Sequence, residues 1–168
     1  RRKKSLSFSD TPRNIGFHTQ NTQQAFAGRI TKPKLTSKLL NRPPFRFIHD
    51  LISAVTRETG FTEGLFTETE ADGKKIKGKG PKVEYLEKAV RCVGIAKGNV
   101  IDANPKKIVA GKECEKTNVF LQILASVAWN EEIDAEECVR RALNNEVPGE
   151  RDAPRNNNVA QDTKSCLL

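Results

Sequence analysis

Between residues 43 and 143, apolar residues recur at helical spacing in several segments, with proline or glycine at the segment boundaries. Recurrence every three or four residues is typical of amphipathic helices. No segment shows the strict alternation of polar and apolar residues that a half-buried strand needs. The pattern therefore predicts an all-α fold, a helical bundle built from residues 43–147.

The boundaries of three early helices can be read from their capping residues. Apolar residues from Phe45 onward follow two prolines, and Gly60 is placed to end this helix in a left-handed turn. Thr67 with Glu70 has the pattern of a capping box, which predicts a short helix there. Residues 72–82, DGKKIKGKGPK, are predicted to form a loop, and Pro81 is predicted to start the next helix.

The second half of the bundle is predicted in the same way. Pro105 should open a short helical turn that ends at Gly111. The next segment is apolar on nearly all sides, which is typical of the central helix of a bundle, and Thr117 is its predicted N-cap. Asp134 with Glu137 predicts the start of a last helix.

Charge divides the chain into three parts. Residues 1–42 contain ten Lys or Arg and one acidic residue, a net charge of +9, whereas residues 43–148 contain sixteen basic and seventeen acidic residues. Apolar residues are scattered in the first part, so residues 1–42 are predicted to be a basic extended arm without a regular core. Residues 148–168 are predicted to be a polar C-terminal tail. The fold expected is thus a helical bundle with extended tails at both ends.

No catalytic, cofactor or metal site is predicted. The cysteines, at positions 92, 114, 138 and 166, are too far apart in sequence for a zinc half-site and are expected to be reduced thiols. Adjacent His49 and Asp50 would diverge by ~100° on a helix, so a structural histidine is the better interpretation. The glycines of residues 73–80 lack the signature of a phosphate loop. We therefore expect a protein that is not an enzyme.

Five short sequence segments together resemble a known family. In order they are PPFRFIHDLI (43–52), TGFTEGLFT (59–67), KVEYLEKAV (82–90), PKKIVAGKECEKTN (105–118) and DAEECVRRAL (134–143). Their order and spacing are similar to those of the amino-terminal calponin-homology domain of the intraflagellar transport protein 54 family, also called microtubule-interacting proteins associated with a TRAF adaptor. The resemblance implies a calponin-homology fold and binding to tubulin or microtubules in cilia.

Cationic side chains are the candidate microtubule-binding residues, because tubulin surfaces are acidic. They fall in the arm, in the glycine- and lysine-rich loop and around the IVAG motif: Arg1, Arg2, Lys3, Lys4; Lys74, Lys75, Lys77, Lys79, Lys82; and Lys106, Lys107, Lys112, Lys116. The last four follow the family's basic positions. The alternative is that the loop lysines are simply solvated and that RRKK is a localisation signal. Arg140 and Arg141 also match the family, but at a helix end they are expected to stabilise the helix dipole.

The expected function is non-catalytic binding of tubulin in cilia, by a structural microtubule-associated protein of the axonemal doublet. This stationary role is favoured because the chain contains no heptad repeats that could assemble it into a transport train. The alternative is an adaptor subunit of an intraflagellar transport complex, which would bind tubulin or protein partners through the same domain. The expected location is the axoneme and cytoskeleton of the cilium, with other axonemal or transport proteins as further partners. Neither nucleic-acid binding nor membrane insertion is expected.

Overall fold

The computed structural model describes residues 11–149, and within that range the chain contains helices and connecting segments but no strand. The helices are α2 (Thr11–Phe26), α3 (Ser37–Asn41), α4 (Phe45–Thr59), α5 (Glu68–Ala71), α6 (Lys79–Lys97), α7 (Pro105–Val109), α8 (Cys114–Ala128) and α9 (Ala135–Leu143). The predicted all-α fold is confirmed. Arg1 to Lys4 and most of the predicted C-terminal tail lie outside the described residues.

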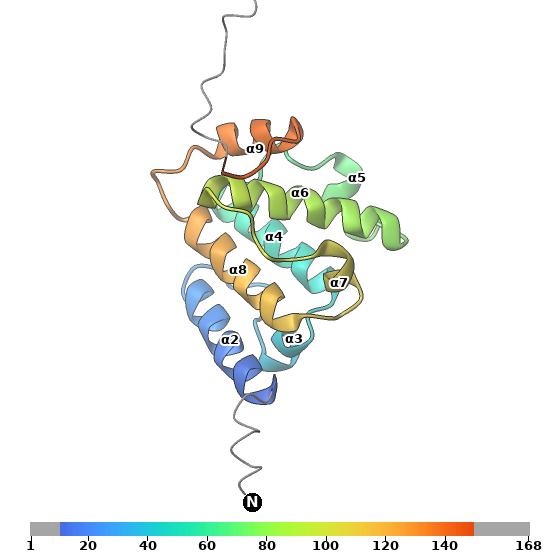
Figure 1. Ribbon diagram of the computed structural model, residues 1–168, viewed down its shortest axis with the longest axis vertical. Helices are drawn as coiled ribbons and strands as arrows, with labels where there is room; N and C mark the ends of the chain where they lie inside the picture. The colour runs from blue at the N-terminus through green and yellow to red at the C-terminus, as the bar shows by residue number, and fades with distance from the viewer. Residues whose placement is uncertain (1–10, 150–168) are drawn as a thin grey trace, which may run out of the picture.

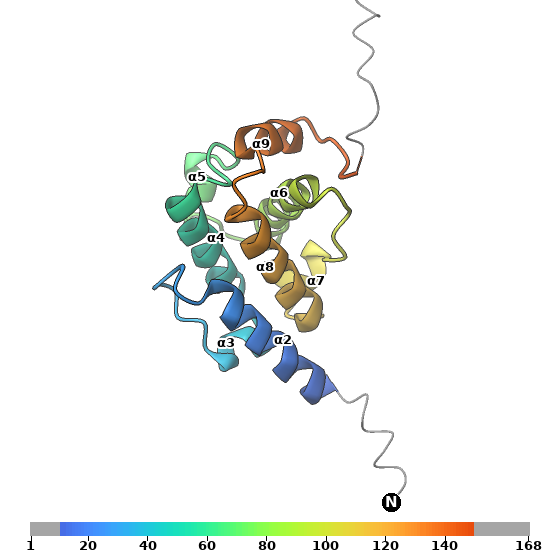
Figure 2. The same ribbon diagram turned by 90° about the vertical axis from the view of Figure 1, so that its left-hand side faces the viewer.

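Helix α8 lies at the centre of the bundle. It packs against α2 on one side and against α6 and α4 on others, as Figures 1 and 2 show. Phe120, Leu121 and Leu124 of α8 are completely buried. Because this helix has neighbours on several sides, its sequence is apolar around most of its circumference. The prediction of a central helix is confirmed.

The prediction that residues 1–42 form an extended arm is wrong for residues 11–42. Helix α2 packs along α8, and α3 packs against both of them. Phe26 and Leu40 are 1% and 0% exposed, so the bundle extends across the boundary expected at residue 43. The inward face of α2 also carries buried Thr19 and Thr22, which a search for apolar periodicity does not detect.

Several helix ends lie where the sequence predicts them. Gly60 ends α4 in the left-handed region with φ of 74°, and its N–H donates to the Thr56 carbonyl. The capping box of Thr67 and Glu70 is present in both directions. Asp134 accepts a hydrogen bond from the Glu137 N–H and so caps α9. In each case a local interaction fixes the boundary, which is why the sequence reveals it.

The starts of α6 and α8 differ from the prediction. Helix α6 begins at Lys79 rather than Pro81, so the last part of the expected loop is helical. Helix α8 begins at Cys114, with Glu113 before it in the left-handed region at φ of 53°. Thr117 is therefore not an N-cap: it lies inside the helix, buried, and its hydroxyl donates to the Glu113 carbonyl. The apolar residues of the sequence begin later than the helix because Cys114, Glu115 and Lys116, which start it, are only partly buried.

Candidate binding surface

The loop between α5 and α6 holds the first group of candidate lysines. Lys74, Lys75 and Lys77 are exposed there. Ile76 is 6% exposed and anchors the loop in the core, and Gly73 packs so closely on the His49 ring that a Cβ at this position would lie 2.9 Å from Nδ1. The ammonium groups of these lysines are thus displayed from a turn that is fixed at two points, Gly73 and Ile76.

Lys79 and Lys82 belong to the first turn of α6. The ammonium of Lys82 lies 5.5 Å from the centre of the Phe45 ring, within the range of a cation–π contact. This contact joins the start of α6 to the start of α4. Lys79 is exposed and Lys82 is half-buried, so Lys79 is the more available of the two.

Helix α7 presents the second group. Asn104 caps it by accepting hydrogen bonds from the backbone N–H groups of Lys106 and Lys107, and buried Ile108 anchors its inner side. The side chains of Lys106 and Lys107 are exposed on the outer side, and Lys112 follows in the next loop, also exposed. Proline, the Asn cap and one apolar anchor therefore suffice to hold a five-residue helix with its lysines outward.

Two lysines of this group are already paired within the chain. Lys107 forms an ion pair with Glu113, and Lys116 lies 3.0 Å from Asp102 and 3.7 Å from Glu113. The hydrogen bond to Asp102 raises the pKa of Lys116. Lys106 and Lys112 form no ion pair with any residue in the described range. Of these four lysines, Lys106 and Lys112 are the more able to meet an external carboxylate.

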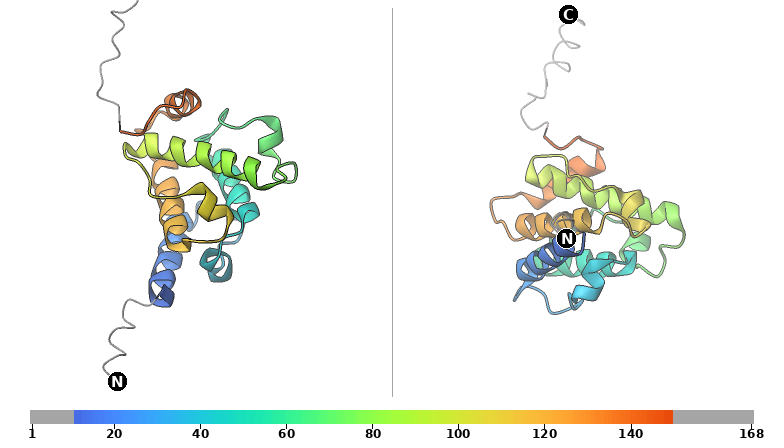
Figure 3. Two further views of the ribbon diagram at one scale, coloured as in Figure 1. Left: turned by 45° about the vertical axis from the view of Figure 1, so that its right-hand side comes forward. Right: turned by 60° about the horizontal axis from the view of Figure 1, so that its bottom comes forward.

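The fold adds cations that the sequence assigns to the arm. Arg42, directly after α3, lies against the loop after α7, since a Cβ at Gly111 would be 3.0 Å from the Arg42 Nε. Gly111 has φ of +69°, a conformation that other residues rarely adopt. Lys38 of α3 is exposed nearby in the chain. In Figure 1 and in the left view of Figure 3, α3, α7 and the first turn of α8 lie together.

We call this region the basic face and define it by Arg42, Lys106, Lys107, Lys112 and Lys116. The structure brings Arg42, which directly follows α3, against the loop after the IVAG lysines. The start of α6 lies on the same side of the bundle as α7 in Figure 1. The sequence does show these cations, since residues 11–42 contain six basic residues and no acidic one. Sequence reasoning predicts an extended arm for this segment because it has few apolar residues.

Arg140, Arg141 and His49 all contact other groups of the same chain. Arg140 is paired with Glu137, and Arg141, only 8% exposed, is bound to Glu146. His49 is 3% exposed, with Nε2 at 2.8 Å from the Glu70 carbonyl oxygen. These contacts agree with the structural interpretation of all three residues.

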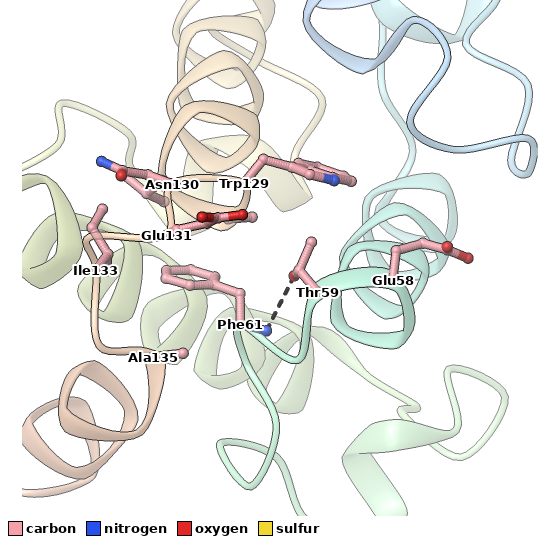
Figure 4. A pocket seen from close by; sticks show the side chains of 10 residues that line it. Glu58, Thr59, Phe61, Trp129, Asn130, Glu131, Ile133 and Ala135 are labelled. Carbon is pink, nitrogen blue, oxygen red and sulfur yellow. Dashed lines mark hydrogen bonds between the residues drawn. The ribbon is translucent and has the colours of Figure 1, made fainter.

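A separate hollow of about 290 Å³ lies between the ends of α4 and α8 (Figure 4). Its walls include Phe61, Trp129 and Ile133, with Glu58 and Glu131 among the lining residues. The Thr59 hydroxyl donates to the Val55 carbonyl and accepts from the Phe61 N–H, so it is committed to the backbone. The lining residues therefore include no pairing of a nucleophile with a base.

Two further properties concern the described residues as a whole. Residues 11–149 contain no group of three or more His, Cys, Asp or Glu side chains that could hold a metal ion. None of the helices in that range combines the length and the apolar character that crossing a membrane requires.

The Cys92 thiol is buried, which raises its pKa.

Comparison with known proteins gives one family. Residues 18–130 match the model described as "Microtubule-binding protein MIP-T3 CH-like domain". The chain is 43% identical over 124 residues to TRAF3-interacting protein 1 of Danio rerio, an alignment that covers 74% of this chain and 20% of the relative. It is 38% identical over 143 residues to the proteins of the same name in Mus musculus and Rattus norvegicus, covering 85% of this chain and 23% and 22% of those relatives.

Proposed function

This chain belongs to the family of the microtubule-binding MIP-T3 CH-like domain, and we propose that it binds microtubules non-catalytically through the basic face. The chain spans only about a fifth of the length of the relatives it matches, so the proposal concerns the domain. The family model starts at residue 18, within α2, in agreement with the packing of α2 in the bundle.

The observation that carries the proposal is the grouping of cations at the N-terminal end of α8. Lys106 and Lys112 are exposed and unpaired within the described range, and Arg42 is held beside them by its packing on Gly111. An acidic protein surface is the natural partner of such a group, because opposite potentials attract over about 10 Å at moderate salt. Tubulin has that chemistry.

The binding would consist of many weak contacts. One exposed pair of Lys with a carboxylate contributes only about 0–1 kcal/mol. Affinity would therefore come from the sum over the basic face, with additional contributions from Lys74, Lys75, Lys77 and Lys79, and from Arg1 to Lys4 of the N-terminal segment. Such a sum predicts a strong decrease of binding as salt is raised.

The experiment is co-sedimentation with microtubules at several salt concentrations. Lys106→Glu and Lys112→Glu should each weaken binding about three- to tenfold at low salt, since each removes one attraction and adds one repulsion. The matched control is Arg57→Glu, which changes the net charge equally at an exposed position at the end of α4. Equal losses in all three variants would contradict a localised basic face. Binding of the unaltered chain that does not depend on salt would contradict the mechanism.

We place the domain in the cilium, as a structural component of the axonemal doublet, and its family relationship supports this location. The second candidate is an adaptor subunit of intraflagellar transport. Its adaptor character is supported by the relatives' name, TRAF3-interacting protein 1, which describes proteins that interact with another protein. Photobleaching of the tagged, full-length gene product in cilia separates the two: a doublet component stays in place, and a transport subunit moves along the axoneme.

A further inference from the structure

The hollow between the ends of α4 and α8 combines apolar walls with carboxylates (Figure 4). Phe61 is buried at its inner side, and Trp129 and Ile133 are half-buried in its walls. Glu58 of α4 and Glu131, from the segment after α8, also line it and are exposed. The described residues that line the hollow include no Lys, Arg or His. Its own side chains therefore favour an occupant that carries both cations and apolar groups.

The carboxylates of the hollow are available to a partner. Glu58 lies 3.5 Å from the Arg57 Nε, but both side chains are exposed, and such a pair contributes little. Glu131 forms no ion pair within residues 11–149, and neither does exposed Glu132, which follows it in the chain.

The backbone adds to the negative potential of the hollow. Thr59 is the last residue of α4 and Ala128 the last of α8, and both line the hollow. The C-terminal end of a helix carries about half a negative charge on its last carbonyl groups. Helix α9 begins at Ala135 in the lining, but Asp134 and two glutamates of its first turn already meet its positive end. Side chains and helix ends thus both attract a cation.

One cation of the chain already lies beside the hollow. The Arg29 guanidinium carbon is 5.1 Å from the centre of the Trp129 ring, and Nη1 donates to the Ala125 carbonyl in the last turn of α8, at 3.4 Å. The structure therefore shows that this ring and this helix end bind a cation. Arg29 forms no ion pair with Glu58 or Glu131, so both carboxylates remain for another one.

The chain contains a segment of complementary composition, RRKKSLSF (1–8), with four cations followed by two apolar side chains. Within one copy, Phe8 cannot reach the hollow. Helix α2 is about 24 Å long, and the ring of Phe26, at its far end, lies 6.1 Å from the Trp129 ring. The steps from Phe8 to Thr11 span at most about 11 Å. Figure 1 accordingly shows the start of α2 well away from the end of α8.

We propose that the hollow binds residues 1–8 of a second copy of the chain, with the cations facing Glu58 and Glu131 and Phe8 against the apolar walls. The contact joins two different surfaces, so it can link successive copies. The inference does not depend on the proposed function, because it concerns contact between copies. The same four cations are candidates for tubulin, and the test therefore contains no microtubules.

The test is sedimentation velocity of the full chain, which should show association that increases with concentration and decreases with salt. Glu58→Lys with Glu131→Lys should weaken association about tenfold or more, because two attractions become repulsions. A cation suits the end of a helix, so the fold should not be destabilised. The matched control is Glu84→Lys with Glu87→Lys on the exposed side of α6, which changes the net charge equally and should associate like the unaltered chain.

A charge exchange identifies the occupant. The variant Arg2→Glu, Lys3→Glu, Lys4→Glu should also weaken association, and its combination with the two substitutions of the hollow should restore it, because opposite charges face each other again. If this variant associates like the unaltered chain, or if the combination does not restore association, residues 1–8 are not the occupant and the inference is overturned.

Trp129 provides a local signal, because it is the only tryptophan of the chain. A synthetic peptide of residues 1–10, which contains no tryptophan, should change the Trp129 emission of the unaltered chain in a saturable manner. The hollow variant should respond only weakly. A chain that stays monomeric, equal association of the hollow variant and its control, or no response of Trp129 would each overturn the inference. None of these results affects the proposed function, which co-sedimentation with microtubules tests separately.

Discussion

The Thr22 hydroxyl of α2 donates a hydrogen bond of 2.9 Å to the Asn118 side-chain oxygen of α8, and both residues are completely buried. The Asn118 amide in turn donates to the carbonyls of Leu40 and Cys114, both at 2.8 Å. Gln122 donates to the Thr22 hydroxyl at 3.1 Å. These bonds attach α2 and α3 to the central helix and so hold in place Lys38 of α3 and Arg42 directly after it.

Thr22→Val should therefore destabilise the fold, although valine has nearly the same size as threonine, because it removes the hydroxyl. It takes the donor away from the buried Asn118 oxygen and removes one of the two acceptors of the Gln122 amide, which also donates to the His18 carbonyl. This change predicts a loss of about 2 kcal/mol. The control is Thr19→Val on the same helix, where the buried hydroxyl donates only to the Gly16 carbonyl. That variant should lose about 0.5 kcal/mol or less. Urea denaturation measures both, and equal losses would show that the contact between the helices is not responsible.

Removal of residues 1–42 should prevent cooperative folding, whereas removal of residues 1–10 should not. The longer deletion takes away Phe26 and Leu40, which are buried, and exposes the polar groups of Asn118 and Gln122. The shorter deletion leaves every contact among the described residues intact. Circular dichroism during thermal unfolding should show a single transition for residues 11–168 and none for residues 43–168. A cooperative transition of the shorter chain would mean that α2 and α3 are accessory.

Asp102→Asn should strengthen microtubule binding. Asp102 holds the Lys116 ammonium at 3.0 Å, and the substitution deletes this negative charge beside the basic face and leaves Lys116 only its longer pair with Glu113, at 3.7 Å. One additional available charge pair predicts an increase in affinity of about threefold at low salt. The control Glu136→Gln makes the same change of net charge on exposed α9. Equal increases in the two variants would mean that total charge matters, and not the release of Lys116.

The capping box of α5 should make stability depend on pH in the acid range. Burial by itself raises the pKa of the Glu70 carboxyl, but hydrogen bonds from Lys88 and from Thr67 outweigh it, and the net pKa is lowered from 4.5. A carboxyl with a lowered pKa in the folded state stabilises the fold above its unfolded pKa, and this stability is lost as the pH falls through the lowered value.

Glu70→Gln should therefore be about 1 kcal/mol less stable than the unaltered chain at pH 7. The difference should shrink as the pH falls below 4.5. Glu68→Gln, in the same turn but exposed, is the control and should show little difference at either pH. Denaturation curves measured across this pH range provide the comparison. A constant difference between Glu70→Gln and the unaltered chain would exclude the carboxylate as the cause.

Much of the fold could be predicted from local sequence. Gly60, the pair Thr67 and Glu70, and Asp134 each fix a helix end through a neighbouring backbone group, so a few residues are enough to predict them. The central position of α8 could be predicted as well, because a helix with neighbours on several sides must be apolar on several sides. The five short segments between residues 43 and 143 also reveal the family to which the chain belongs.

Helix α2 could not be predicted in this way. Its inward face carries two buried threonines, and the Thr22 hydroxyl is paired with Asn118, about a hundred positions later in the chain. A buried polar residue is tolerated only when its partner is present, and no pattern within residues 11–42 reveals that partner. The chain therefore resembles a polar arm there until α8 is considered. The prediction that Thr117 is an N-cap is wrong for a related reason. This threonine lies within α8 and is buried by tertiary packing, which the local sequence does not reveal.

The sequence by itself determined which segments of residues 43–147 are helical, where the lysines stand along the chain and to which family it belongs. These properties depend on neighbours within a few residues or on direct similarity. Only the tertiary structure decided which cations share a surface and which are already neutralised. Arg42 and Lys112 are seventy residues apart in sequence, and Lys107 and Lys116 have acidic partners whose position depends on the fold. Electrostatic attraction depends on distance in space, and the packing of α3 and α7 against α8 sets those distances.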